Sequence, residues 1–425
     1  MSLLIKGGQV LDPINKRNGI FDVLIADGKI REIAPEISRE LAYEVIDADG
    51  KLVVPGLVDM HVHLREPGRE DEETIESGTF SAAKGGFTSV ACMPNTEPPL
   101  DKGPLIEFVK EKALKVGSAN VFPIGCVTKG RDGAELAEMA ELYSAGAVAF
   151  SDDGNSIMRS EVMRRALEYS KIFNAPIIVH EEDKELAADG SMNEGYVSTR
   201  LGLKGIPKAA EEVMVARDIV LAQLTGGRLH IAHVTSAGSV DMIRDAKKKG
   251  IKVTAEVTPH HLVLTDEAVD GFDTNTKVSP PLRTSKDIEA LIEGLKDGTI
   301  DTIATDHAPH TREEKETEYD IAPPGMIGLE TAFPLVMTYL VRKGHLTVEE
   351  VISKMTIEPA RILRLDKGTL TIGADADIAI IDPEKEVTLD VKNFASKSRN
   401  SPFHGWRLQG IIYMTILSGR VVYRS

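Results

Sequence analysis

The chain has 425 residues, of which 42% are hydrophobic and 27% are charged, and its formal net charge is −16 at pH 7. This length is enough to bury a large core and to form a barrel-sized domain with a smaller domain beside it. The acidic balance argues against a protein that wraps nucleic acid or binds anionic lipid, because both functions need clustered Lys and Arg side chains.

The sequence also lacks the signals of membrane and secreted proteins. No apolar run reaches the roughly 18 residues that a membrane span needs, and no basic and then apolar signal peptide pattern opens the sequence. The two cysteines, Cys92 and Cys126, form neither a CxxC pair nor a disulfide framework. We therefore expect a cytoplasmic protein in a reducing compartment.

Both ends of the chain read as antiparallel β-structure. Near the N-terminus, β-like runs such as "FDVLIADGKIREIA" alternate with turns at Asp27-Gly28 and Asp49-Gly50. Residues 365–425 show the same pattern in "KGTLTIGADADIAIID" and "GIIYMTILSGRVVYRS". Since a lone hairpin is marginal in water, we expect residues 1–55 and 365–425 to form one discontinuous β-sandwich domain.

The middle of the chain, residues 56–364, has the rhythm of a parallel sheet with helices. Helical segments with apolar residues three and four positions apart occur at 103–117, 160–173, 209–226 and 285–298. Apolar strand candidates alternate with them at 53–64, 87–95, 120–127, 146–153, 175–182, 228–235, 251–261 and 301–310. Eight such strands predict an α/β protein with a (β/α)₈ TIM-like barrel.

Polar residues gather where these strands end. In this architecture the C-terminal ends of the strands form the active-site face. The residues at these ends are His61, His63, Asn95, Asp152, Asp153, His180, His233, His260, His261, Asp306, His307 and His310.

Several of these side chains are typical metal ligands. His61 and His63 are two positions apart, so they point to the same face if the segment is extended. His180, His233 and Asp306 follow other strands at the same end of the barrel. Imidazoles with a carboxylate suit zinc, although ligand type alone leaves manganese, cobalt and iron open. The histidines outside these strand ends, interpreted as ordinary residues, are His230, His345 and His404.

Eight short strings, in chain order, carry a family resemblance. They are "DMHVHLREPG", "ACMPNTEPP", "FSDDG", "IIVHEED", "IAHVTS", "AEVTPHHL", "SPPLR" and "ATDHAPHT". Together they resemble the amidohydrolase superfamily and, within it, the longer, class I dihydroorotases. The family fold is a metal-bearing barrel with a β-sandwich built from both termini, which agrees with the pattern of strands and helices.

The resemblance implies a site for one or two Zn²⁺ ions. Relatives such as hydantoinases bridge their metals with a carboxylated lysine after the fourth strand, whereas "GAVAFSDDG" offers no lysine there. Asp153 takes that place by family register, although "SDDGN" is also good turn chemistry for Asp152 or Asp153. The implied ligands are His61, His63 and Asp306 for one ion, His180 and His233 for the second, and Asp153 between them.

The implied reaction interconverts L-dihydroorotate and N-carbamoyl-L-aspartate in pyrimidine (UMP) biosynthesis. Asp306 would take the proton of the attacking water and deliver it to the leaving nitrogen. Arg65 would grip the substrate carboxylate, which hydantoins and allantoin lack. The alternative for Arg65 is a salt bridge at the barrel rim, with Glu66, Glu70 or Asp71.

Further substrate contacts follow from the family register. Asn95 and His310 accompany the arginine, and backbone groups near Pro324 and Gly325 close over the ring. Ser279 stands where the resemblance predicts an asparagine, so it contacts the substrate through water or not at all. The polar stretch 311–320 after the eighth strand is either a mobile lid or a plain surface loop.

Two other functions stay open at this point. One is a different cyclic amidohydrolase, such as a dihydropyrimidinase or an allantoinase. The other is a weakly active dihydroorotase-like subunit that scaffolds aspartate transcarbamoylase. The resemblance also implies a homo-oligomer, and it leaves open whether aspartate transcarbamoylase is a partner.

Overall fold

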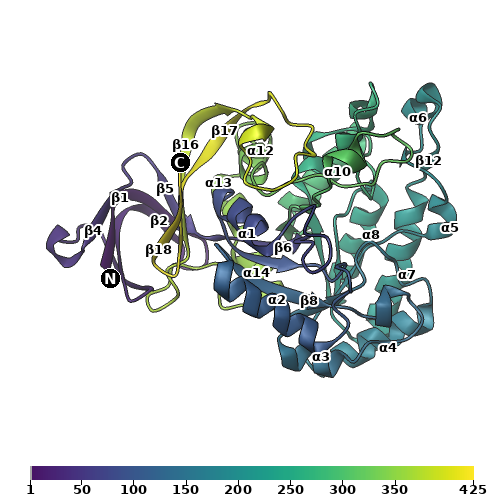
Figure 1. Cartoon of the computed structure of the whole chain (residues 1–425), viewed down its shortest axis with the longest axis horizontal. Helices are drawn as coiled ribbons and strands as arrows, with labels where there is room; N and C mark the ends of the chain where they lie inside the picture. The colour runs from purple at the N-terminus through teal and green to yellow at the C-terminus, as the bar shows by residue number, and fades with distance from the viewer. Residues whose placement is uncertain (1) are drawn as a thin grey trace.

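The computed structural model describes residues 2–425, and its largest part is a barrel of parallel strands, on the right in Figure 1. Backbone contacts join the two ends of the sheet, because His63 N donates to His307 O at 2.9 Å beside a parallel bridge between Val62 and His307. This confirms the predicted barrel. In pairing order the strands are β6 (Leu57–Val62), β7 (Phe87–Cys92), β8 (Asn120–Gly125), β9 (Ala149–Ser151), β10 (Ile177–Val179), β13 (Leu229–Ile231), β14 (Val253–Val257) and β15 (Thr302–Ile303).

The first strand candidate, residues 53–64, is divided between two sheets. β5 (Leu52–Pro55) belongs to the sheet of the chain ends, and β6 opens the barrel. Gly56 lies between them, and a Cβ there would come within 2.1 Å of Thr88 Oγ1. The close passage of the two segments therefore requires glycine at the junction.

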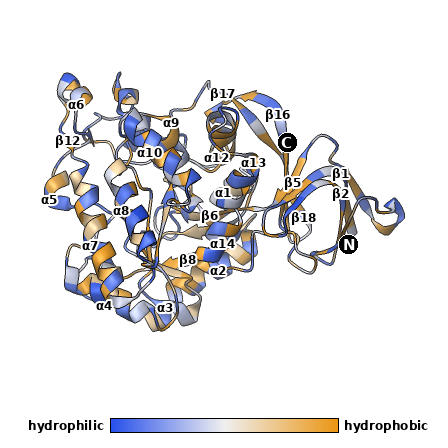
Figure 2. Ribbon diagram, turned by 180° about the vertical axis from the view of Figure 1, so that it is seen from behind, coloured by the Kyte–Doolittle hydropathy of each residue, from blue (hydrophilic) through white to orange (hydrophobic). Residues whose placement is uncertain are grey.

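Helices alternate with the barrel strands, and their apolar faces cover the barrel. All four predicted helices are present, at α2, α4, α7 and α10. Figure 2 shows β8 mainly in the hydrophobic colour, whereas the outer helices mix both colours. The longer helices are α1 (Ile75–Lys84), α2 (Gly103–Val116), α3 (Met139–Ala145), α4 (Ser160–Ser170), α7 (Ala209–Thr225), α8 (Ala237–Lys248), α10 (Ser285–Lys296), α13 (Val348–Lys354) and α14 (Ile357–Leu363).

Short elements decorate the connections at the barrel mouth. None of the helices within residues 2–425 combines the length and apolarity needed to cross a membrane. The short elements are α5 (Lys184–Ala187), β11 (Met192–Asn193), α6 (Tyr196–Leu201), β12 (Gly205–Ile206), α9 (Pro259–Val263), α11 (Arg312–Lys315) and α12 (Ala332–Val336).

The two ends of the chain share one sheet, as expected (Figure 1). The N-terminal and C-terminal parts join where β5 pairs antiparallel with β16, for example Val54 with Ala379. The exact domain boundaries stay a prediction. The remaining strands are β1 (Ser2–Asp12), β2 (Arg17–Ala26), β3 (Lys29–Ala34), β4 (Glu44–Asp47), β16 (Ile378–Thr388), β17 (Arg407–Leu417) and β18 (Arg420–Arg424).

Between β16 and β17 the chain leaves this sheet and runs to the barrel. In this 389–406 segment, Phe394 and Phe403 pack in one apolar cluster with Met326 and Leu335. Asn400 Nδ2 donates to Ala308 O at 2.9 Å and to Gly325 O at 3.0 Å. The C-terminal part of the chain therefore helps to build the barrel mouth.

Candidate metal and active site

Six predicted side chains from five strand ends converge at the barrel mouth, and all are at most 7% exposed. His61 Nε2 lies 3.4 Å from Asp153 Oδ1 and 3.4 Å from Asp306 Oδ1. His63 Nε2 lies 3.0 Å from Asp306 Oδ1. The group is completed by His180 Nδ1 and His233 Nε2, which are 3.0 Å apart.

The donor atoms of this group fit a metal ion. They form three overlapping triads whose ligand atoms lie within 4.8 Å of one another. His61 Nε2 and Asp153 Oδ1 are buried and have no hydrogen-bond partner within residues 2–425. Buried polar atoms are rarely left unpaired, so nitrogen and oxygen atoms that face one another across this space indicate a cation site. The triads are His61, His233 and Asp306; His61, His63 and Asp153; and Asp153, His180 and His233.

The buried carboxylates of the site create a field that favours a cation. Burial raises the pKa of Asp306, but the imidazoles of His61 and His63 outweigh burial and lower that pKa overall. Burial lowers the pKa of His61, but Glu256, Asp153 and Asp306 outweigh it and raise that pKa well above its usual value. The carboxylates are therefore anionic at neutral pH, and their field favours a positive charge at His61.

Two residues turn the paired histidines of β6 toward the cluster. His61 Nδ1 donates to Glu256 Oε1 at 2.5 Å, and His63 Nδ1 donates to Asn95 Oδ1 at 2.8 Å. Such contacts fix the tautomer and leave each Nε2 free to bind a metal. Sequence reasoning missed Glu256, although a glutamate inside the apolar strand β14 was a usable signal. His230 contacts the other oxygen of Glu256 at 3.2 Å and belongs to none of the triads.

The two aspartates after β9 have different tasks. Asp152 accepts hydrogen bonds from Val127 N at 2.9 Å and Thr128 N at 3.1 Å, so it fixes a loop. Asp153 points into the histidine cluster instead. The turn-forming interpretation therefore describes Asp152, and Asp153 is the member of the pair that a metal could use.

Backbone strain accompanies the strand ends. His233 has φ of 32° and Asp306 has φ of 48°, and non-glycine residues rarely adopt positive φ. Strain of this kind is common where a fold positions functional side chains.

A cavity of about 320 Å³ opens over the cluster. Its walls include His63, Asp153, His180, His233 and Asp306. All six predicted substrate contacts line the same cavity: Arg65, Asn95, Ser279, His310, Pro324 and Gly325. A ligand in this space would touch both groups of residues.

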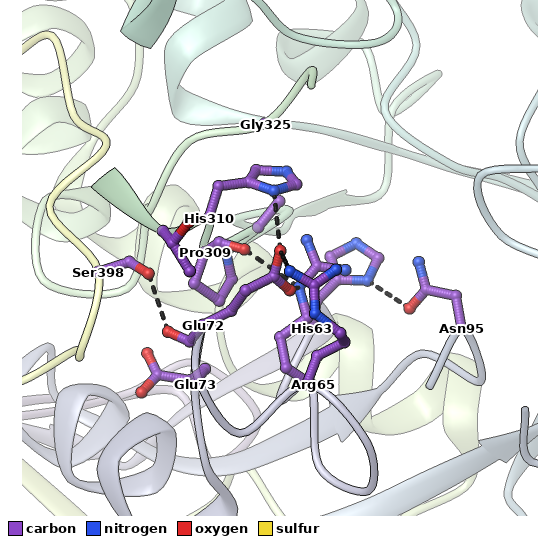
Figure 3. A network of polar contacts seen from close by, with 12 residues as sticks. His63, Arg65, Glu72, Glu73, Asn95, Pro309, His310, Gly325 and Ser398 are labelled. Carbon is purple, nitrogen blue, oxygen red and sulfur yellow. Dashed lines mark hydrogen bonds and ion pairs between the residues drawn. The ribbon is translucent and has the colours of Figure 1, made fainter. Parts of the chain in front are cut away.

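Arg65 is a partly buried residue with an unpredicted partner. Its Nε lies 2.8 Å from Glu72 Oε2 and donates to Pro309 O at 3.1 Å (Figure 3). The rim partners considered from the sequence have other contacts: Glu66 accepts from Ile75 N, and Glu70 accepts from Gly68 N. Asp71 pairs with Arg69. Arg65 therefore forms its salt bridge with Glu72 and not with the three considered partners, and its side chain is 11% exposed and lines the cavity.

The segment 311–325 is more closely packed than its polar sequence indicates. Lys315 is 6% exposed and Tyr319 is 4% exposed. Lys315 Nζ donates to Pro323 O at 2.8 Å and to Gly325 O at 3.1 Å. Burial, together with nearby Lys277, lowers the pKa of Lys315 to about 7. Sequence periodicity could not reveal this packing, because the side chains that anchor the segment are amphipathic.

Comparisons with known proteins agree with this fold. A family model described as Dihydro-orotase-like matches residues 50–239, and one described as Amidohydrolase family matches residues 225–423. The dihydroorotase of Pelotomaculum thermopropionicum is 60% identical, with 100% of this chain and 99% of that protein covered. The dihydroorotase of Acetivibrio thermocellus is 56% identical over 100% of this chain and 99% of that protein.

Solved structures of related hydrolases have the same fold. The L-hydantoinase (dihydropyrimidinase) of Arthrobacter aurescens has a TM-score of 0.90 at 28% identity, covering 99% of this chain and 96% of that chain. The dihydropyrimidinase of Brevibacillus agri has a TM-score of 0.87 at 27% identity, covering 100% and 95%. The barrel with its histidine and aspartate cluster thus defines a hydrolase of the amidohydrolase class. Within that class, the chain belongs to the dihydroorotase family.

The lowered pKa of Lys315 predicts that the opening of segment 311–325 depends on pH. When segment 311–325 opens, Lys315 regains its ordinary pKa of 10.5, so opening takes up a proton between about pH 7 and that value. Opening should therefore become less favourable as pH rises from 7 to 9. Cleavage by a Glu-specific protease at Glu313, Glu316 or Glu318, normalised to a free peptide of the same sequence, should slow over this range.

Two variants control that measurement. In Lys315→Met the pH dependence of normalised cleavage should disappear, whereas Arg312→Met, at an exposed position of the same helix, should keep it. A wild-type profile that is flat from pH 7 to 9 would contradict the role given to Lys315.

Proposed function

We propose that this protein interconverts L-dihydroorotate and N-carbamoyl-L-aspartate in pyrimidine biosynthesis. One observation carries the proposal: the partly buried side chain of Arg65 and the metal-type cluster line one small cavity. A cyclic amide that carries a carboxylate matches both parts of the cavity. Arginine recognises carboxylates, and the histidine and aspartate cluster suits amide hydrolysis. Membership of the dihydroorotase family supports the same substrate.

Zinc is the proposed cofactor, with one or two ions per subunit. His61, His63 and Asp306 would hold one ion, His180 and His233 the second, and Asp153 would lie between them. When bound, zinc would polarise the substrate carbonyl and make water more acidic. The mixed imidazole and carboxylate donors support this choice.

Asp306 is the proposed catalytic acid and base. Its carboxylate borders the cavity, and its lowered pKa keeps it ionised at neutral pH, which a general base requires. In ring opening, the water oxygen bonds to the carbonyl carbon and Asp306 takes the water proton. The carbon to ring nitrogen bond then breaks, and Asp306 delivers that proton to the nitrogen. Ring closure follows the same path in reverse.

Several groups would orient the substrate. Arg65 would bind its carboxylate, with His310 beside it. Asn95 uses its Oδ1 to hold His63, which leaves its Nδ2 for the substrate. Ser279 borders the cavity with a side chain shorter than the expected asparagine. The backbone at Pro324 and Gly325 would cover the ring.

The other expectations stay predictions. A weakly active scaffolding subunit for aspartate transcarbamoylase is less well supported, because all six ligand-type side chains are present and converge. The homo-oligomer, the association with aspartate transcarbamoylase and the cytoplasmic location are not needed for the chemistry proposed for this cavity.

A substrate panel with metal control tests the proposal directly. Purified protein should hydrolyse L-dihydroorotate and cyclise N-carbamoyl-L-aspartate, lose both activities after chelation, and regain them with Zn²⁺. Dihydrouracil, hydantoin and allantoin should react at least about a hundredfold more slowly, because they lack the carboxylate that Arg65 binds. Faster turnover of a carboxylate-free substrate would favour a dihydropyrimidinase-like function instead.

Arg65→Met should remove carboxylate recognition and leave the metal site intact. Charge-assisted bidentate contacts are worth a few kcal/mol, so kcat/KM for L-dihydroorotate should fall by about a hundredfold or more. Zinc content, measured by elemental analysis, should equal that of the wild type and of Arg312→Met. Kinetics close to wild type would show that Arg65 does not bind the substrate.

Glu256→Gln should weaken metal binding by loosening the orientation of His61. Removing such a supporting carboxylate typically costs about 10-fold to 100-fold in metal affinity. Chelator competition measures this change, and Thr254→Val is the matched control because Thr254 contacts His230 and not His61. Equal zinc affinity in Glu256→Gln and wild type would remove Glu256 from the metal site.

A further inference from the structure

The carboxylate of Glu72 lies close to the cavity residues Arg65 and His310 (Figure 3). Glu72 is 2% exposed and lies in the loop between β6 and α1. Its Oε2 is 2.8 Å from Arg65 Nε, and its Oε1 is 3.0 Å from His310 Nδ1 and 3.2 Å from an Nη of Arg69. Two of its three partners are thus residues to which we assign recognition of the substrate carboxylate.

We propose that Glu72 is a positioning residue for substrate recognition, which holds Arg65 and His310 in the orientation that binds the carboxylate of the substrate. This inference rests on the proposed function and deepens it. Glu72 itself would not touch the substrate, because it is absent from the cavity wall that Arg65 and His310 share.

The contacts of Arg65 support this role. Both the ion pair with Glu72 and the hydrogen bond to Pro309 use Nε, and within residues 2–425 neither Nη has a hydrogen-bond partner. Arginine has a long side chain whose immobilisation costs up to about 2 kcal/mol of rotamer entropy. Because Glu72 fixes the guanidinium in advance, the two Nη groups are available to a ligand without that cost.

The contacts of His310 also support a positioning role for Glu72. Nδ1 of His310 lies 3.0 Å from Glu72 Oε1, and Nε2 lies 3.0 Å from Pro324 O. Together these two contacts fix the orientation of the ring beside the cavity. Glu72 therefore sets the orientation of a second residue of the same recognition site.

The negative charge of Glu72 also keeps two arginines close together. Arg65 and Arg69 both pair with this carboxylate. Arg69 also forms a salt bridge with Glu314 on α11, in which one Nη lies 2.6 Å from Oε1. An amide at position 72 would leave the two guanidinium groups to repel each other, which would displace Arg65. Glu72, His310 and Glu314 also form a group that could hold a cation. However, Glu72 already pairs with both arginines, and Glu314 already pairs with Arg69.

The backbone of Glu72 is held separately from its side chain. Ser398 Oγ donates to Glu72 O at 2.8 Å, and Glu72 N donates to Arg69 O at 3.0 Å. A change of the carboxylate alone should therefore spare the loop and the metal cluster. This separation makes the proposal testable by substitution.

The test compares Glu72→Gln with Glu70→Gln, an exposed position of the same loop. Glu72→Gln should raise the KM for L-dihydroorotate about tenfold or more, with kcat changed less than about threefold. Zinc content and melting temperature should match those of Glu70→Gln. In the Arg65→Met background, Glu72→Gln should cause a smaller further loss in kcat/KM than it causes in the wild type, because only its effect through His310 remains.

Glu72→Asp is the second variant. It keeps the charge but withdraws the carboxylate, so its KM should lie between those of wild type and Glu72→Gln, and it decides the question if the Gln variant does not fold. A KM within about twofold of wild type, a fall in kcat alone, or a loss of zinc would overturn the proposal. If the wild type does not turn over L-dihydroorotate, the proposed function itself fails, which is a separate result.

Discussion

The site depends on the seam between β6 and β15, where the barrel closes on itself. His63 and Asp306 are 243 positions apart in the chain, yet their side-chain atoms lie 3.0 Å apart. Buried Asp59 holds this seam, since its Oδ1 accepts from His61 N at 3.1 Å and from Thr305 N at 3.2 Å. The triad of His61, His233 and Asp306 could not assemble without this closure, because Asp306 and His61 come from opposite ends of the sheet.

The balance of buried charges is the second constraint on the site. Asp153, Asp306 and Glu256 place three buried carboxylates near one another. Without cations they would repel the anionic substrate that we propose, and burial would be costly. Metal ions at the cluster and the guanidinium of Arg65 would supply the opposite charge. With the proposed ligand, the same cations would both stabilise the site and admit that ligand.

The sequence predicted the parts of the site that follow from strand periodicity. The alternation of His61 and His63, and the polar residues after each strand, locate the cluster because the ends of parallel strands meet at one mouth. It could not predict Glu72 or the burial of Lys315, because both depend on contacts between loops that have no periodic pattern. The division of residues 53–64 between two sheets was also missed, because it depends on the passage of Gly56 beside Thr88.

The 389–406 segment explains why both ends of the chain must meet beside the barrel. Asn400 binds Ala308 O and Gly325 O, and its Oδ1 accepts from His310 N at 3.3 Å. The Asn400 side chain thus connects the segment that follows β15 to the backbone that borders the cavity at Gly325. Ser398 holds the loop of Glu72 from the same segment. Because β16 and β17 anchor this segment in the sheet of the chain ends, that sheet takes part in shaping the side of the cavity that His310 and Gly325 line.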